Sequence, residues 1–313
     1  MKKRDYNLIV ILGPTATGKT MLAARLGRDL TSEIISADSR QVYRDMNLGT
    51  GKDLEEFVVD GVAVPYHLID IVDPTHEFSV FEYQKRFYEA FLKISRKGIV
   101  PIMVGGTGLY IEAIIEGYSM REVPENPDLR DTLEKEDGEA LGNRLHRLSP
   151  THHNTTDLLD RNRLIRAIEI AEYTESHKLE KEEERPEIVP LVIGIRYERE
   201  MIRQRIRDRL QERIKRGMID EVKSLHASGV SWDKLDFFGL EYRYVSAHLQ
   251  GKMGYDEMCD TLATKINQFS KRQITWFRRM ERRGTVIHWI DGADYTQLKD
   301  MVSKHLLLNV NER

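Results

Sequence analysis

Residues 8–20 read Leu-Ile-Val-Ile-Leu-Gly-Pro-Thr-Ala-Thr-Gly-Lys-Thr, and this stretch decides the fold. Its five apolar residues, mostly β-branched or leucine, predict a buried parallel strand. The next eight residues, 13–20, match the phosphate-binding pattern G-x-x-x-x-G-K-[ST], and a predicted helix begins at Met21. Because a strand before and a helix after are the context in which this pattern works, we predict that a polyphosphate binds here.

The spacing within this phosphate loop has a chemical reason. Gly13 and Gly18 allow the backbone to curl so that successive N–H groups point at phosphate oxygens. Lys19 adds a point charge, Thr20 offers a hydroxyl to Mg²⁺, and the helix N-terminus adds partial positive charge. We therefore predict Mg²⁺ as cofactor with Thr20 as its protein ligand. The predicted phosphate-binding residues are Gly13, Pro14, Thr15, Ala16, Thr17, Gly18, Lys19 and Thr20.

Length and composition limit the class of protein. A chain of 313 residues with a net charge of −3 has enough material for one large domain or two modest ones. Its one cysteine, Cys259, excludes a disulfide framework and a cysteine-based zinc site and suits a reducing cytoplasm. No signal-peptide pattern follows Met1, and no apolar run approaches the roughly 20 residues that span a bilayer. We therefore expect a cytoplasmic protein without a membrane segment.

Strands and helices alternate through most of the chain, which predicts an α/β fold, a doubly wound parallel sheet carrying the phosphate loop. Further strands are predicted at residues 33–37, 62–73, 99–104, 188–195 and 287–291. The alternation stops over residues 120–187, which have no strand-like run and are predicted to form helices at 128–137, 139–148 and 158–177. We therefore expect a catalytic core from 1–119 and 188–313 with a helical insertion domain at 120–187.

Asp38 follows the strand at 33–37, at the sheet edge where ligands of open α/β sheets bind. The strand at 99–104 ends in Gly-Gly-Thr, without the acid that motors and GTPases place after a second buried strand. With Thr107 and Thr20 in reach, Asp38 is a candidate for taking a proton from an incoming nucleophile. The alternative, that Asp38 holds a Mg²⁺-bound water or caps the following helix, stays open.

Two basic clusters indicate the class of partner. Residues 196–216 hold nine bases and four acids, and residues 265–283 hold seven bases and one acid. With the aromatic residues Phe269, Trp276, Phe277 and Tyr242, they are typical of a nucleic-acid surface. The alternative is a pair of solvated helix faces lined by long basic side chains. Arg205 and Arg209 have a second option, because they can reach the phosphate loop and stabilise a leaving pyrophosphate.

Seven segments, in order, resemble the bacterial tRNA dimethylallyltransferases, and the match runs from about Leu8 to Asp291. They are residues 13–20, 35–43 (Ile-Ser-Ala-Asp-Ser-Arg-Gln-Val-Tyr), 49–52, 67–70, 104–110, 162–169 and 271–277 (Lys-Arg-Gln-Ile-Thr-Trp-Phe). The resemblance implies transfer of a dimethylallyl group from dimethylallyl diphosphate to N6 of the adenosine 3′ to the anticodon of tRNA, with diphosphate released.

The resemblance also implies roles for individual residues. Asp38 would be the general base, Thr107 would contact the flipped adenosine, and Arg209, or else Arg205, would steady the pyrophosphate held by loop 13–20 and Mg²⁺. The partners would be dimethylallyl diphosphate and the anticodon stem-loop of tRNA, bound by a monomer. The expected tRNA contacts, including two from the basic cluster, are Asp38, Ser39, Arg40, Gln41, Thr107, Arg130, Asn162, Arg163, Leu164, Ile165, Arg166, Phe238, Gly239, Leu240, Glu241, Tyr242, Arg243, Lys271 and Arg272.

Glu241 departs from the family pattern, which usually has glycine before the tyrosine at position 242. No Cys/His zinc module follows the core. Three alternative functions remain: the related transferase that modifies free adenine nucleotides, a phosphate-loop kinase of a small metabolite, and an NTP-dependent nucleic-acid binding module. The helical insertion and the two basic clusters favour tRNA, because a free nucleotide needs neither.

Overall fold

The computed structural model describes residues 6–120, 122–149, 160–177 and 185–306. The chain forms two compact units, which we call the core unit (Met1–Tyr118 with Pro186–Arg313) and the insertion unit (Ser119–Arg185). The sequence places the corresponding boundaries at residues 120 and 187. Within the described ranges, no helix combines the length and apolar character needed to cross a bilayer.

The core unit contains a six-stranded, all-parallel sheet, which confirms the predicted α/β class. The strand order is β5-β2-β6-β1-β7-β8. The strands are β1 (Leu8–Leu12), β2 (Ile34–Ala37), β5 (Tyr66–His67), β6 (Ile102–Gly105), β7 (Pro190–Arg196) and β8 (Ile287–Asp291). In β1, all five residues are buried, and Ile9 lies opposite Ile102 on one side and Leu191 on the other. The phosphate-loop strand is therefore central in the sheet.

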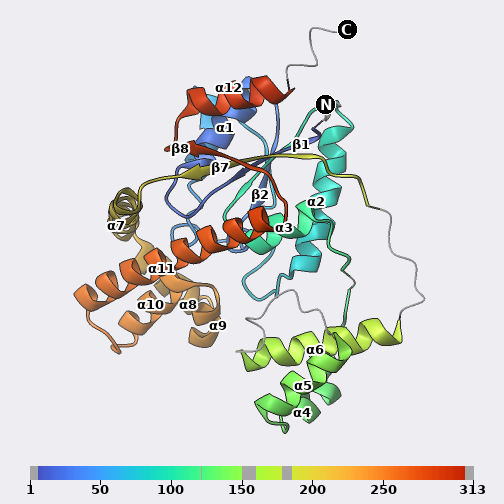
Figure 1. Ribbon diagram of the computed structural model, residues 1–313. Helices are drawn as coiled ribbons and strands as arrows, with labels where there is room; N and C mark the ends of the chain where they lie inside the picture. Colours follow the sequence, from blue (N-terminus) through green and yellow to red (C-terminus); the bar gives the residue numbers. More distant parts are fainter. Residues whose placement is uncertain (1–5, 121, 150–159, 178–184, 307–313) are drawn as a thin grey trace. The chain divides into compact units, whose positions relative to one another are not determined.

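Alternate residues of β1 enter two different cores, as the period of a strand requires. Leu8, Val10 and Leu12 pack with α2 (Val80–Ser95), α3 (Gly108–Ile115) and the C-terminal part of α11 (Tyr255–Arg282). Ile9 and Ile11 pack with α1 (Lys19–Asp29) and α12 (Tyr295–Leu306). Figure 1 shows α1 and α12 above the sheet and α3 and α11 below it. Both faces are covered, so the sheet is doubly wound.

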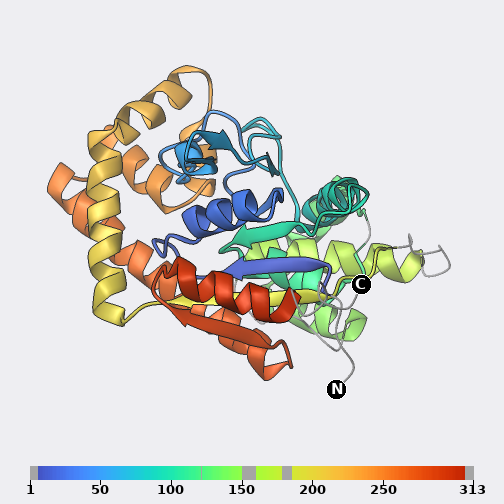
Figure 2. The same ribbon diagram turned by 90° about the horizontal axis from the view of Figure 1, so that it is seen from above.

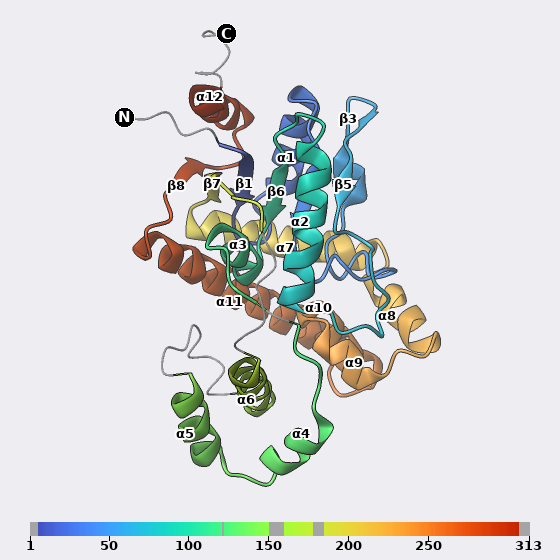
Figure 3. The ribbon, with the colours of Figure 1, turned by 90° about the vertical axis from the view of Figure 1, so that its right-hand side faces the viewer.

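A third core lies beyond the carboxyl ends of the strands. In Figure 2 the arrowheads of β1 and β6 point toward α7 (Arg199–Lys215). Ile202, Ile206 and Leu210 of α7 pack with the start of α11 and with three further helices, which Figure 3 labels. Those helices are α8 (Met218–Ala227), α9 (Trp232–Phe237) and α10 (Leu240–Leu249). The sheet edge that carries the phosphate loop therefore faces the layer of helices that begins with α7.

Two elements differ from the sequence-based prediction. The extended piece expected at 62–73 is instead a hairpin of β3 (Val58–Val59) and β4 (Val62–Ala63), followed by short β5, with a 3₁₀ turn η1 (Leu54–Phe57) before it. Asp60 and Gly61 both have positive φ, the conformation that closes a two-residue hairpin. Residues 256–268 and the basic stretch after them form one helix of 28 residues, because no glycine or proline interrupts it.

In its described residues, the insertion unit contains the helices α4 (Pro127–Leu133), α5 (Gly138–Leu148) and α6 (Arg161–Ser176). Each helix begins at a side-chain cap, since Asn126, Asp137 and Asp160 each accept the backbone N–H three residues on. Residues 158–159 of the predicted third helix lie outside the described residues. The unit has a small core of its own, made of Leu133, Leu141, Leu145, Leu164, Ile165 and Ile168.

Candidate active site

The phosphate loop has the curled backbone that its sequence predicts. Ala16 and Gly18 have φ values of 63° and 77°, and Gly18 precedes the first turn of α1, which contains no acid. The Thr17 hydroxyl donates to the Pro14 carbonyl oxygen at 2.9 Å, and the Lys19 ammonium donates to the same oxygen at 3.3 Å. The loop is thus closed upon itself, with Lys19 and Thr20 at the helix N-terminus, the usual geometry for binding an anion.

Three arginines of α7, spaced four residues apart, line the loop. The Nε of Arg205 donates to the Ala16 carbonyl oxygen at 2.7 Å. Arg209 and Arg213 lie against Gly51, where a Cβ atom would overlap both guanidinium groups. Gly51 has a φ of 70°, so glycine is required there for two reasons. Arg213 was not among the site residues predicted from the sequence. Together with Arg205 and Arg209 it forms a row of cations beside the loop.

Burial makes this positive charge costly in the free protein. Burial lowers the pKa of Lys19 to about 8, and the nearby Arg209 guanidinium lowers it further toward that value. Burial also lowers the pKa of Arg209 to about 10. Among the described residues, Asp53 is the one acid within 4.0 Å of the Arg209 and Arg213 guanidinium groups. Its carboxylate lies 3.2 Å from Arg213 and 4.0 Å from Arg209. The Nε atoms of Arg209 and Arg213 are buried without a hydrogen-bond partner in the described structure. A group of cations left short of acceptors suits a multiply charged anion.

Asp38 lies directly beyond the end of β2. Its Oδ1 accepts the Arg40 N–H at 2.9 Å, and no other hydrogen bond to this carboxylate occurs among the residues that the structure describes. The Thr107 hydroxyl oxygen accepts the Ser39 N–H at 3.0 Å, and the Thr107 N–H donates to the Ala37 carbonyl oxygen at 3.1 Å. The ends of β2 and β6 are therefore joined, which places Thr107 beside the residues that flank Asp38, as the sheet rule predicts.

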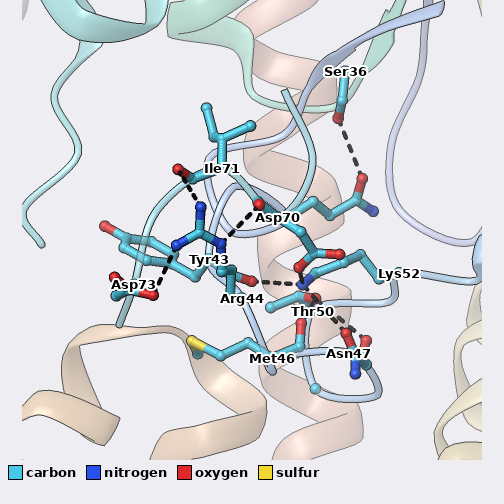
Figure 4. Close-up of polar contacts among 12 residues, drawn as sticks. Ser36, Tyr43, Arg44, Met46, Asn47, Thr50, Lys52, Asp70, Ile71 and Asp73 are labelled. Carbon is cyan, nitrogen blue, oxygen red and sulfur yellow. Dashed lines mark hydrogen bonds and ion pairs between the residues drawn. The ribbon is translucent and has the colours of Figure 1, made fainter. Parts of the chain in front are cut away.

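A buried lysine, Lys52, holds the segment that carries Gly51. Figure 4 shows the Lys52 ammonium between the Tyr43 carbonyl oxygen, the Asn47 side chain and the Asp70 carboxylate. The Lys52 side chain is fully buried. This explains why residues 49–52 and 67–70, far apart in the sequence, both belong to the family pattern.

Gln41 also holds the segment that carries Gly51. Its Nε2 donates to the Gly51 carbonyl oxygen at 3.1 Å, and its Oε1 accepts from the Ser36 hydroxyl at 3.2 Å. Both ends of this amide are therefore used within the protein. The side chain expected to contact tRNA instead helps to seat Gly51 against the arginines.

Glu221 of α8 also anchors this segment. Its carboxylate accepts three successive backbone N–H groups, those of Asn47, Leu48 and Gly49, at 2.7–3.0 Å, and the Tyr242 hydroxyl at 2.8 Å. The Tyr242 ring fills the place where a Cβ of Gly49 would be. Sequence reasoning missed Glu221, because nothing in a helical run marks one acid as the partner of a distant turn.

The aromatic side chains of the predicted RNA surface divide into two sets, because Phe269 is exposed and Trp276 is half-buried, whereas Tyr242 and Phe277 are buried. Phe238, Tyr242 and Phe277 are all buried in the hydrophobic cores, so their side chains are not available to stack on bases. The charged part remains available, because Lys271 and Arg272 are exposed on α11. Arg272 lies over the exposed ring of Phe269 at 5.8 Å.

The remaining predicted contacts of the core unit lie around the start of α10. Gly239, with a φ of 137°, precedes this helix, Leu240 is its first residue, and Arg243 is exposed. Glu241 lines a small cavity together with Thr15, Arg209 and Arg213, and burial raises the pKa of its carboxyl group. The residue that departs from the family pattern therefore faces the phosphate site.

In the insertion unit, the predicted contacts divide into three sets. Leu164 and Ile165 are buried in its core, so their side chains are not accessible to a partner. Arg130 and Arg166 both bind the carboxylate of Glu169, which is itself buried. Asn162 and Arg163 are exposed at the start of α6. The exposed pair is the part of this stretch that is accessible to a partner.

The donor set suits a magnesium ion that is carried largely by its ligand. No group of three or more His, Cys, Asp or Glu side chains positioned for a metal occurs in the described ranges. Mg²⁺ commonly takes one or two protein oxygens and fills its other positions with water and substrate phosphates. The Thr20 hydroxyl, at the N-terminus of α1, meets that requirement.

Comparison with known proteins gives a consistent result. The family model described as IPP transferase matches residues 41–280, and the one described as isopentenyl transferase matches residues 6–62. The chain is 59% identical over 300 residues to tRNA dimethylallyltransferase 1 of Syntrophus aciditrophicus, covering 96% of this chain and 98% of that protein. It is 55% identical over 286 residues to the enzyme of the same name from Geotalea uraniireducens, covering 91% and 93%. The crystal structure of the full-length tRNA isopentenylpyrophosphate transferase from Bacillus halodurans superposes with a TM-score of 0.70 at 31% identity, covering 98% of this chain and 99% of that one.

Proposed function

The chain belongs to the IPP transferase family, and we propose that it transfers a dimethylallyl group from dimethylallyl diphosphate to N6 of the adenosine 3′ to the anticodon of tRNA. One observation carries the chemistry. A half-buried row of cations, two of whose Nε atoms have no acceptor among the described residues, lies beside the phosphate loop, and the carboxylate of Asp38 lies at the neighbouring strand end. The first group suits a diphosphate that leaves, and the second suits an amine that loses a proton.

The cations act on the leaving group. As the bond between C1 of the dimethylallyl group and the diphosphate oxygen breaks, its electron pair stays on that oxygen. In this proposal Lys19, Arg205, Arg209 and Arg213 stabilise the growing charge. Mg²⁺, held at Thr20, would neutralise further phosphate charge. Donors that are already in place need no rearrangement at the moment of reaction.

Asp38 acts on the nucleophile. The lone pair of adenine N6 is delocalised into the ring, so the new N–C bond forms more easily as N6 gives up a proton. The carboxylate oxygen of Asp38 accepts that proton, while Oδ1 stays oriented by the Arg40 N–H. Thr107, fixed by the Ser39 N–H, is placed to position the base.

The RNA must present an unstacked base, because an adenine within a stacked loop cannot reach a carboxylate at a strand end. We propose that Ser39, Arg40 and Arg243 surround this base, and that Lys271 and Arg272 bind the phosphate backbone. Asn162 and Arg163 of the insertion unit would add further contacts. A tRNA substrate implies action in the cytoplasm, and we propose that the protein acts there as a monomer.

The test is a label-transfer assay. Pure protein is incubated with Mg²⁺ and dimethylallyl diphosphate labelled in its hydrocarbon part, in parallel with unmodified tRNA and with AMP. We expect label in tRNA, at N6 of the adenosine 3′ to the anticodon after nuclease digestion. Label in AMP alone would establish the free-nucleotide transferase, and ATP consumption without label transfer would establish a kinase. Either result would overturn the proposal.

A further inference from the structure

Gln273, in the middle of α11, joins the phosphate loop to the turn after β6. Its side chain is 7% exposed. Its Oε1 accepts the Thr15 N–H at 2.9 Å, and its Nε2 donates to the Gly106 carbonyl oxygen at 2.9 Å. One amide therefore satisfies two buried backbone groups, one from each of the two turns that carry the proposed chemistry.

The surrounding chain is built to allow this contact. A Cβ atom at Gly106 would lie 2.5 Å from Nε2 of Gln273, and one at Gly108 would overlap the ring of Trp276, one helical turn further along α11. Gly106 and Gly108 both have negative φ, so neither glycine is needed for backbone conformation. Because neither glycine has a side chain, α11 can lie directly against this turn.

Each partner of Gln273 is next to a group that the reaction uses. Thr15 belongs to the loop that receives the diphosphate, and its N–H, held by Gln273, fixes the orientation of the peptide between Pro14 and Thr15. Gly106 precedes Thr107, whose hydroxyl oxygen accepts the Ser39 N–H and whose own N–H donates to the Ala37 carbonyl oxygen. Asp38 lies between those two partners. Gln273 therefore links the diphosphate loop to the strand end that holds the base.

We propose that Gln273 is a positioning residue that fixes the separation between the diphosphate and the carboxylate of Asp38 during group transfer. This inference rests on the proposed function. In-line transfer depends on near-contact distances, and an error of about 1 Å in the placement of reacting groups costs up to about 10²-fold in rate. An amide suits this position because it carries an acceptor and a donor on the same carbon of an uncharged side chain, one for each backbone partner.

Two variants test the proposal. Gln273→Met keeps the length and volume but removes both hydrogen bonds, and Gln273→Glu keeps the acceptor for Thr15 but turns an oxygen toward the Gly106 carbonyl oxygen. For both we expect kcat to fall about 10- to 100-fold. The KM for tRNA and the Kd for a non-reactive alkyl diphosphate should stay within about threefold, because no substrate contact is removed. The share of dimethylallyl diphosphate that is hydrolysed by water rather than transferred to tRNA should rise.

The control is Gln211→Met on α7, an exposed glutamine outside the site, for which all these values should match the unaltered protein. Circular dichroism and calorimetric binding of the analogue confirm that each variant is folded. A kcat within twofold of the unaltered protein would overturn the positioning role. So would a fall in kcat matched by an equal loss of diphosphate affinity, since that indicates collapse of the loop. Absence of transfer by the unaltered protein would instead refute the proposed function.

Discussion

The pH dependence of diphosphate binding follows from the burial of Lys19. In the free protein the pKa of Lys19 is lowered to about 8, first by burial and then by the Arg209 guanidinium. A bound diphosphate favours the charged form, so binding requires a proton that the free lysine loses above pH 8. The protonated fraction falls from about nine tenths at pH 7 to about one tenth at pH 9, so we expect the dissociation constant to rise about tenfold, ~1.4 kcal/mol.

The assay is calorimetric titration with a non-reactive alkyl diphosphate in the presence of Mg²⁺, at constant ionic strength, from pH 7 to 9. A terminal phosphate with a pKa of about 6 is already about nine tenths ionised at pH 7, so the ligand contributes little to the change. Arg209, with a pKa of about 10, stays largely charged. In Lys19→Arg, the dissociation constant should be nearly independent of pH. A constant affinity in the unaltered protein, or the same decline in Lys19→Arg, would refute the reasoning.

Four variants, one of them a double substitution, test other parts of the site. Asp38→Ala should lower turnover at saturating substrates about 10²- to 10⁴-fold in the label-transfer assay; unchanged turnover with weaker tRNA binding would give Asp38 a binding role. Replacing Lys271 and Arg272 by alanine should weaken tRNA binding and reduce its salt slope by roughly one to two, whereas an unaltered slope would mean that both charges face solvent. Glu241→Gln should tighten alkyl diphosphate binding by roughly threefold or more, because it removes a negative charge from the cavity; an equal affinity would contradict this. Glu221→Gln should destabilise the protein by about 1–3 kcal/mol in chemical denaturation, because an amide cannot accept all four hydrogen bonds, and an unchanged midpoint would argue against that anchoring role.

The parts of the site that are local in sequence were predictable. The phosphate loop is a continuous stretch whose glycines, lysine and threonine each have one task, so its geometry follows from the pattern. Asp38 and Thr107 each follow a parallel strand, and the sheet rule alone brings such residues to one edge. Arg205, Arg209 and Arg213 are spaced four residues apart. The pattern that indicated the first two arginines therefore also indicated Arg213, which was not among the predicted site residues.

The parts that depend on tertiary packing were not predictable. Tyr242 and Phe277, next to basic residues, have the composition of an RNA surface, but their neighbours in space make them core residues. Gln41 has the polarity of a contact residue, yet its amide is used to hold Gly51. Composition reports which side chains can bind a partner, whereas burial decides which of them are left to do so.

The central place of β1 has a consequence for synthesis on the ribosome. One neighbour of β1 is β7, which begins at Pro190, and the arginines of α7 follow it. In a nascent chain that ends before Pro190, β1 and its phosphate loop can therefore pair with a neighbouring strand on one side only. The arginines of α7, which complete the phosphate site, have not yet been synthesised. The insertion unit, whose buried leucines and isoleucines all precede that point, can fold during this interval as an independent unit. Competence to bind diphosphate is thus acquired late in translation, once β7 and α7 have been synthesised.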